Sequence, residues 1–348
     1  MIKRTSTRTR IGAVVVSIGA LAMAAGCGSD DNGDGGSADA GGLSTVKVMM
    51  FPGQAYRLEP LVAEQEGFFE DHGIKMEITD QPPTLQGIQG LYATKSDVGQ
   101  VTVGTLGQGV QAGDEAKFFC GGIDVLQTSL MVPTDSKLPS TEDGASWEEV
   151  LKSLDGKKVG IQTPVGSGLQ LIFAAALEEA GVKDVTYVNL GGAPTGTIAA
   201  LENGSVDVAQ TNPPTTQYFE ESGAAKSILY MSDGPKVYAD NYGSGWVAPT
   251  AWLDDNPELA TEFCAAMTEA LEFIKDPANK ENVSALFEKD SGLEPKTVSK
   301  VVEVAYSDFS TELDETTLQN TFDSYTDLGI LKAEPEMTYD TLVDDKTK

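Results

Sequence analysis

The sequence predicts an α/β protein with two lobes, each built on a mixed, mostly parallel β-sheet, and a helical C-terminal extension. The 348 residues are enough for two domains of ordinary size. Short β-like runs alternate with helical runs, and this alternation occurs twice in succession, which is typical of parallel sheets covered by helices. After residue 246, apolar residues recur at helical spacing. These helices need an apolar surface to pack on, and we expect the first lobe to provide it.

The first α/β set is expected between residues 44 and 132. Apolar runs of strand length predict strands, and apolar residues at helical spacing predict helices between them. Gly73 follows the first helix as a stop signal. Strands are expected at 47–50, 75–79, 97–103, 117–119 and 129–132, and helices at 58–71, 84–94 and 106–112.

The second set repeats this rhythm. Helices are expected at 147–151, 168–180, 195–203 and 214–221, and strands at 158–162, 185–190, 206–210 and 227–231. Gly181 and Gly204 directly follow two of these helices, where glycine commonly ends a helix. The C-terminal helices are expected at 257–275, 280–289, 295–306 and 315–328, and Pro257 suits the first turn of the first of them.

The N-terminus has the form of an export signal. Residues 1–10 carry four basic side chains, and residues 11–25 are apolar but too short for a comfortable membrane span. The run ends in Ala-Ala-Gly-Cys at 24–27, which resembles a bacterial lipoprotein signal, although Ala24 stands where leucine is usual. The resemblance implies cleavage of a signal peptide at 1–26 and lipidation of Cys27.

A plain secretory signal with an incidental cysteine is the alternative. Residues 27–43 argue for the lipoprotein reading, because they are rich in Gly, Ser and Asp and hold almost nothing to bury. Such a segment is typical of a flexible tether, and a tether has a purpose if Cys27 is anchored. We therefore expect an extracytoplasmic protein attached to the cell membrane by a lipid.

The charge excludes a nucleic-acid partner. Residues 1–26 hold four of the 24 basic side chains and no acidic one, so the remainder carries 20 basic against 53 acidic side chains, a net of −33. Such a surface repels nucleic acid.

Two cysteines remain after Cys27. Export permits a disulfide, and Cys120 and Cys264 both stand in apolar surroundings. We favour a bridge between them, with two separate buried thiols as the alternative. No cluster of histidines and cysteines suggests a metal site, and no cofactor is expected.

Four segments resemble the solute-binding proteins of the nitrate, sulfonate and taurine importers, a family that includes binders of thiamine-pyrimidine precursors and of aromatic acids. The most specific is EQEGFFEDHGIKMEI at 64–78, which PLVA precedes at 60–63. The others are SDVG at 96–99, GIQTPVGS at 160–167 and AALENGSVDV at 199–208. The resemblance covers about residues 45–290.

The resemblance implies the periplasmic-binding-protein type II fold, a hinged clamp that closes on a ligand. Lobe one would comprise 44–128 plus 232–348, and lobe two 129–231. The family implies an ABC permease and an ATPase as partners, and we expect a monomer that binds a small organic anion, a sulfonate or an aromatic carboxylate. The fold alone does not select the ligand.

Lobe one offers seven candidate ligand-binding residues. In the resembling family the loop after the first strand contacts ligand, which points to Gln54, Tyr56 and Arg57. Arg57 is the only arginine after the signal, and its guanidinium would match a carboxylate or sulfonate, unless it is a surface arginine. The remaining four candidates are Thr102, Thr105, Tyr242 and Trp246. The alternative role of the two threonine hydroxyls is ordinary helix capping, and that of the two aromatic rings is packing in the core.

Lobe two offers four candidates in two loops that end strands and begin helices. Thr163, Gly166 and Ser167 precede the helix at 168–180, whose backbone N–H groups favour negative charge. Ser167 also suits simple capping. Asn212 follows the strand at 206–210, and it also suits a turn before proline.

Three functions stay in competition. The first is the binding subunit of an importer. The second is an enzyme, or a thiamine-pyrimidine-precursor binder, on the same fold. The third is a lipoprotein that senses a ligand without transporting it. We do not expect an enzyme, because His72 is the only histidine and lies far from any nucleophile pattern. No Gly-Lys-Ser/Thr follows the loop at 163–168, which excludes a phosphate-binding Walker motif.

Overall fold

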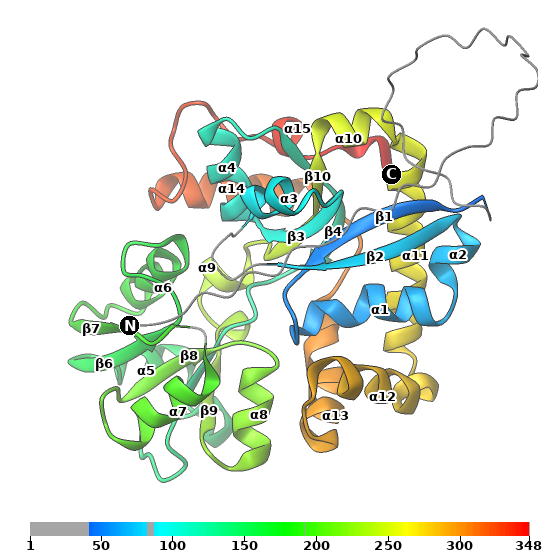
Figure 1. The fold of residues 1–348 in the computed structure, drawn as a ribbon. Coiled ribbons are helices and arrows are strands. Elements are labelled where there is room, and N and C mark those ends of the chain that lie inside the picture. Colours follow the sequence, from blue (N-terminus) through cyan, green and yellow to red (C-terminus); the bar gives the residue numbers. More distant parts are fainter. Residues whose placement is uncertain (1–41, 82–86, 192, 348) are drawn as a thin grey trace, which may run out of the picture. The chain divides into compact units, whose positions relative to one another are not determined.

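The computed structural model describes residues 42–81, 87–191 and 193–347 (Figure 1). The expected signal peptide, Cys27 and nearly all of the expected tether lie outside these residues. No helix in the described ranges is long and apolar enough to cross a membrane.

The first sheet has the strand order β2-β1-β3-β10-β4. β1 pairs in parallel with β2 and with β3, whereas β10 is antiparallel to both of its neighbours. One strand from late in the chain therefore lies between two early strands, which ties the later part of the chain to the first sheet. The bounds are Ser44–Met50 (β1), Ile74–Asp80 (β2), Val98–Thr102 (β3), Ala116–Ile123 (β4) and Ser244–Pro249 (β10).

Helices cover both faces of this sheet because side chains alternate between the faces along each strand. Val48 and Met50 of β1 pack in the core that includes α1 and α11, whereas Met49 packs in the core that includes α3 and α4. The helices are Leu58–Gln65 (α1), Phe68–Asp71 (α2), Ile88–Thr94 (α3), Val103–Ala112 (α4) and Pro257–Lys275 (α11).

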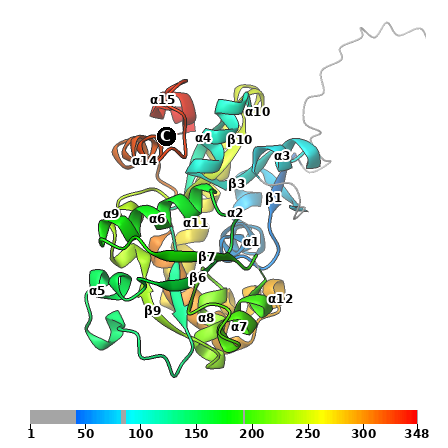
Figure 2. The ribbon, with the colours of Figure 1, turned by 90° about the vertical axis from the view of Figure 1, so that its left-hand side faces the viewer.

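The second sheet has the order β7-β6-β8-β5-β9, parallel from β7 to β8, with β5 antiparallel to its neighbours β8 and β9. Figure 2 shows β6 and β7 side by side in this sheet. Its strands are Ser129–Val132 (β5), Lys157–Ile161 (β6), Val185–Asn189 (β7), Val208–Thr211 (β8) and Lys226–Tyr230 (β9). Its helices are Trp147–Lys152 (α5), Gly168–Glu179 (α6), Pro194–Glu202 (α7) and Thr215–Ser222 (α8).

The C-terminal helices pack mainly on elements of the first sheet. α11 and α12 contact α1, α14 contacts α4, and α15 contacts β4, whereas α13 also contacts α8 beside the second sheet. The remaining bounds are Lys236–Ala239 (α9), Thr250–Asp255 (α10), Lys280–Ser291 (α12), Pro295–Val304 (α13), Glu315–Asp327 (α14) and Tyr339–Leu342 (α15).

The predicted α/β class with two mixed sheets is confirmed, but one predicted helix was wrong and one strand was not predicted. The helix expected at 58–71 is two helices, because Gly67 adopts a left-handed φ of 87° between α1 and α2. β10 was not predicted, because its six residues include Gly245 and Pro249, and both residue types are depleted in strands. The described strands of the first sheet fall within 44–128 and 232–348, and those of the second fall within 129–231.

Candidate functional site

The carboxyl ends of β1 and β3 bring two candidate loops of the first lobe to one edge of the sheet, where ligands commonly bind in open α/β sheets. Thr102 ends β3 and caps α4, because its side chain accepts a hydrogen bond from the backbone N–H of Thr105 at 3.3 Å. The two hydroxyl oxygens lie 2.9 Å apart. The structure thus joins the predicted pair at the N-terminus of α4, where backbone N–H groups favour an oxyanion.

The loop after β1 is held by Tyr56. Its hydroxyl accepts a hydrogen bond from the backbone N–H of Phe51 at 2.9 Å, and its ring stands edge-on to Trp246 at a centroid distance of 6.4 Å. Burial raises the pKa of Tyr56 to about 12, so the phenol stays protonated. Gln54 precedes the short 3-10 helix Ala55–Arg57 and is partly exposed.

Arg57 is buried and paired within the protein. Its Nε and Nη2 donate to the carboxylate of Asp290 at 2.9 and 2.8 Å, and its Nη1 donates to Asp80 at 3.2 Å. The side chain is 7% exposed. The guanidinium fork that the sequence analysis assigned to a ligand anion is therefore occupied by Asp290, a residue 233 positions away. This pairing favours a structural role in which Arg57 ties the start of α1 to α12.

Hydrogen bonds among its own residues and the first turn of α6 hold the loop before α6. Ser167 caps α6 by accepting from the backbone N–H of Gln170 at 3.4 Å, and its hydroxyl donates to Thr163 Oγ1 at 2.8 Å. Gly166 adopts a φ of 89° and donates its N–H to Gln170 Oε1 at 3.0 Å. The three predicted residues Thr163, Gly166 and Ser167 thus form one cluster at the N-terminus of α6.

The first residue of α6 lies against the segment that follows α14. A Cβ on Gly168 would lie 3.2 Å from Cγ2 of Ile330, so the absence of a side chain allows this approach. Asn212, the fourth candidate of lobe two, is exposed between β8 and α8, where its carbonyl accepts from the backbone N–H of Thr216 at 3.2 Å.

Tyr242 and Trp246 lie in the interior, 2% and 0% exposed, so neither ring forms an open aromatic wall. The Tyr242 hydroxyl accepts from the N–H of Gly122 at 3.2 Å and donates to the carbonyl of Glu312 at 3.0 Å. Burial raises the pKa of this phenol far above its usual value. Trp246 is part of β10, where the sheet places it opposite Gln100.

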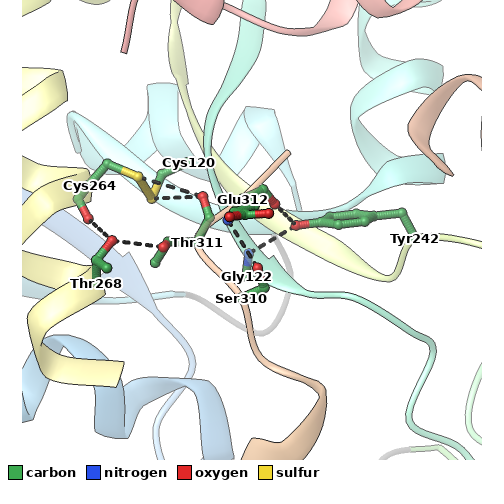
Figure 3. The surroundings of a disulfide bond; sticks show 8 residues. All are labelled: Cys120, Gly122, Tyr242, Cys264, Thr268, Ser310, Thr311 and Glu312. Carbon is green, nitrogen blue, oxygen red and sulfur yellow. Dashed lines mark hydrogen bonds between the residues drawn. A yellow bond between two sulfur atoms is a disulfide. The ribbon is translucent and has the colours of Figure 1, made fainter. Parts of the chain in front are cut away.

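Cys120 and Cys264 form a disulfide that joins β4 to α11, with Cα atoms 5.5 Å apart (Figure 3). Figure 3 shows Thr311 beside the two sulfur atoms and Glu312 at the hydroxyl of Tyr242, so the segment at 310–312 runs between them. A Cβ on Gly121 would lie 2.4 Å from the carbonyl oxygen of Glu312, which requires glycine at this position.

His72 lies apart from the candidate loops, between two carboxylates of α11. Its Nδ1 contacts Glu262 closely, and its Nε2 lies 3.0 Å from Oε1 of Glu269. Partial burial opposes protonation, but the two carboxylates outweigh it and raise the pKa of His72. Among the described residues, no group of three or more His, Cys, Asp and Glu side chains could hold a metal ion.

The family model for NMT1/THI5-like proteins matches residues 55–280, more than half of the chain. The chain belongs to the NMT1/THI5-like family. This confirms the family resemblance inferred from the sequence. A search of curated proteins found no match to the sequence.

Solved structures share the fold of this NMT1/THI5-like protein. The aliphatic sulphonate-binding protein SsuA of Escherichia coli is 17% identical, with a TM-score of 0.68 over 86% of this chain and 92% of that one. The alkanesulfonate-binding protein SsuA of Xanthomonas axonopodis pv. citri, bound to MOPS, is 17% identical, with a TM-score of 0.65 over 86% and 97%. The desulfurization enzyme DszB is 14% identical, with a TM-score of 0.63 over 87% and 97%.

Sequence reasoning missed Glu59, which is fully buried in the first turn of α1. Burial raises its pKa well above the usual value, while the charge of Lys275 and the indole N–H of Trp246 act in the opposite direction. The sequence does contain a signal for the burial of Glu59. It stands three and four residues before Val62 and Ala63, which places it on the apolar face of α1. An acidic residue in such a position needs an explanation.

Proposed function

We propose that this protein is the substrate-binding subunit of an ABC importer, and that it captures a small organic anion between two hinged lobes. The supporting observations are its membership of the NMT1/THI5-like family and the fold that it shares with alkanesulfonate-binding proteins, nearly the whole length of which it matches. A sulfonate or an aromatic carboxylate is the proposed ligand class. The residues of the candidate loops do not single out nitrate or taurine as the ligand.

Two helix N-termini would recognise the anion. Thr102 and Thr105 at α4, and Thr163 and Ser167 at α6, present hydroxyl groups beside backbone N–H groups at the carboxyl ends of β3 and β6. Because Asp290 and Asp80 occupy the guanidinium of Arg57, the proposal rests on these hydroxyls and N–H groups instead of a salt bridge.

The proposal includes an extracytoplasmic location, a lipid on Cys27 and a permease and an ATPase as partners of a monomer. An enzyme on the same fold is the second candidate, and the likeness to DszB favours it. Against it, the two cysteines among the described residues are joined in the disulfide, and His72 lies between two glutamates. These groups therefore leave no thiol beside an imidazole for nucleophilic catalysis.

Thermal unfolding of the purified protein with a panel of alkyl sulfonates, aromatic and aliphatic carboxylates, nitrate and pyrimidines tests the proposal. A ligand at 100 times its dissociation constant stabilises the native state by about 2.7 kcal/mol. We expect stabilisation by one class of anion and no loss of that compound on incubation. Consumption of the compound would show an enzyme, and stabilisation by pyrimidines alone would overturn the anion assignment.

A further inference from the structure

The N-termini of α4 and α6 meet at one side chain. A Cβ built on Gly104, in the first turn of α4, would lie 3.6 Å from Cγ2 of Ile330. A Cβ built on Gly168, the first residue of α6, would lie 3.2 Å from the same atom. Because one methyl group is in van der Waals range of both helices, their first turns are close together. The two helix starts that carry the proposed anion site therefore converge on Ile330.

Two glutamines of α4 hold the segment that carries Ile330. Nε2 of Gln108 donates to the carbonyl of Ile330 at 3.1 Å. The side-chain amide of Gln111 donates to the carbonyl of Lys332 at 2.7 Å and accepts from the N–H of Lys332 at 2.9 Å. These hydrogen bonds fix the segment at 330–332 to α4, so Ile330 moves with this helix.

The end of α14 supports Ile330 as well. Gly329 follows the helix with a left-handed φ of 72°, and the N–H of Ile330 donates to the carbonyl of Tyr325 at 2.8 Å. The ring of Tyr325 also lies against α4, because a Cβ on Gly104 would be 3.4 Å from Cε2 of Tyr325. Ile330 is only 6% exposed, so its side chain has little room to turn aside. It is therefore a rigid part of the α4 side of the contact.

The contact between Ile330 and α6 is of a different kind, because it joins an apolar methyl group to Gly168. Such a contact resists closer approach steeply, but it resists separation only by the small attraction between a few atoms. Thr105 and Ser167, at the two helix starts, are partly exposed, so dissolved anions reach them. The helix starts can therefore move apart to admit an anion, but they cannot approach more closely than Ile330 allows.

We propose that Ile330 is a steric stop that sets the smallest separation between the starts of α4 and α6, and that it thereby selects against the smallest anions. This inference rests on the proposed function, in which closure of the clamp brings the two helix starts onto one ligand. An anion smaller than the separation reaches the hydrogen-bond donors of one helix start only. A larger anion reaches the donors of both and is bound more tightly.

Isothermal titration calorimetry of the purified protein tests the size role with two series of anions. The sulfonates are methanesulfonate, propanesulfonate and benzenesulfonate, and the carboxylates are acetate, butyrate and benzoate. The wild type is expected to bind the largest member of one series more tightly than the smallest. Ile330→Ala removes Cγ2 and lets the helix starts approach, so it should lower this preference on the order of 10-fold to 100-fold, the value of one hydrogen bond to a charged group.

Three further variants separate the stop from a general loss of stability. Ile330→Val is the conservative variant, because it keeps Cγ2 and should retain the preference. Gly168→Ala adds a methyl group at the same contact and should raise the preference, which keeps the test valid if Ile330→Ala does not fold. Ile274→Ala is the matched control. It removes the same atoms from α11 in the other large core, where Ile274 is 4% exposed, and should leave the preference unchanged.

Thermal unfolding without ligand tests the contact itself. The methyl group that Gly168→Ala adds crowds Ile330 in the wild type, whereas in Ile330→Ala it occupies vacated space. The effect of Gly168→Ala on the melting temperature should therefore be more favourable by a few degrees in Ile330→Ala than in the wild type.

The outcomes separate the stop from the anion site. Coupled melting temperatures together with a lowered size preference would support the stop. Additive melting temperatures would overturn it, because the two helix starts would then be apart without ligand. An unchanged preference in Ile330→Ala, with anions still bound, would leave the proposed function intact and overturn the size role. Binding of no anion to the wild type would contradict the proposed function and with it the size role, whatever the melting temperatures show.

Discussion

Replacing both cysteines of the disulfide by alanine tests how far one covalent bond holds α11 on the first sheet. Cys120 and Cys264 are 144 positions apart, and closing a loop of that size in the unfolded chain corresponds to about 5 kcal/mol in the chain-entropy model. Measured losses for native disulfides are about 2–5 kcal/mol. We therefore expect the double variant to lose about 4 kcal/mol, which lowers the melting temperature by about 10 °C.

Urea unfolding of the double variant, the oxidised wild type and the reduced wild type measures this loss. The reduced wild type is the matched control, because it opens the loop without changing the buried side chains. Both should lose similar stability, with a small further loss in the variant where a sulfur is missing from the core. A loss below about 1 kcal/mol in both would refute the reasoning, because the loop would then be held closed without the bond.

Arg57→Leu should destabilise the protein by about 3–5 kcal/mol, because it leaves the buried carboxylate of Asp290 unpaired. The double variant Arg57→Leu with Asp290→Leu should lose less stability, because neither charge remains. Urea unfolding measures both losses, and additive losses of the two single variants would contradict a buried ion pair. The raised pKa of His72 implies that its contribution is full below the unfolded pKa of about 6.5 and disappears as the pH rises through the higher folded value. Melting of His72→Gln and wild type should therefore differ more at about pH 5.5 than at about pH 8.5, and a difference independent of pH would exclude the ion pairs as its source. Cys27→Ala should move the protein from the membrane fraction to the soluble fraction, and retention at the membrane would overturn the lipid anchor. Gly121→Ala should cost about 1–3 kcal/mol, because its Cβ would collide with the backbone at Glu312; unchanged urea unfolding would show that the segment at 310–312 moves away freely.

Local patterns were enough to predict most elements of the two sheets. β5 was expected at its observed bounds, Ser129–Val132, and α11 was expected at Pro257–Lys275, because strand-length apolar runs and helical spacing are properties of neighbouring residues. Capping is equally local, so Thr102 and Ser167 were placed at helix starts before any contact was known. The family also followed from sequence, because its four segments are contiguous motifs.

The role of Arg57 depended on tertiary structure. Its carboxylate partner Asp290 is 233 positions away, and a single sequence does not show which charged residues meet. The same limit applies to Cys120 and Cys264. The sequence is compatible with a disulfide and with two free thiols, and only the contact between β4 and α11 decides for the disulfide.

The sequence by itself determined the α/β class, the order of most helices and strands, and the helix-capping hydroxyls, because these depend on residues close together in the chain. Only the tertiary structure decided that β10 lies between β3 and β4, which buries Trp246 opposite Gln100. It also decided that both carboxyl oxygens of Glu59 are buried without a hydrogen-bond partner. The physical reason is that the burial and pairing of a polar group depend on segments that are distant in the chain and adjacent in the fold. Local sequence patterns do not show which distant segments come together.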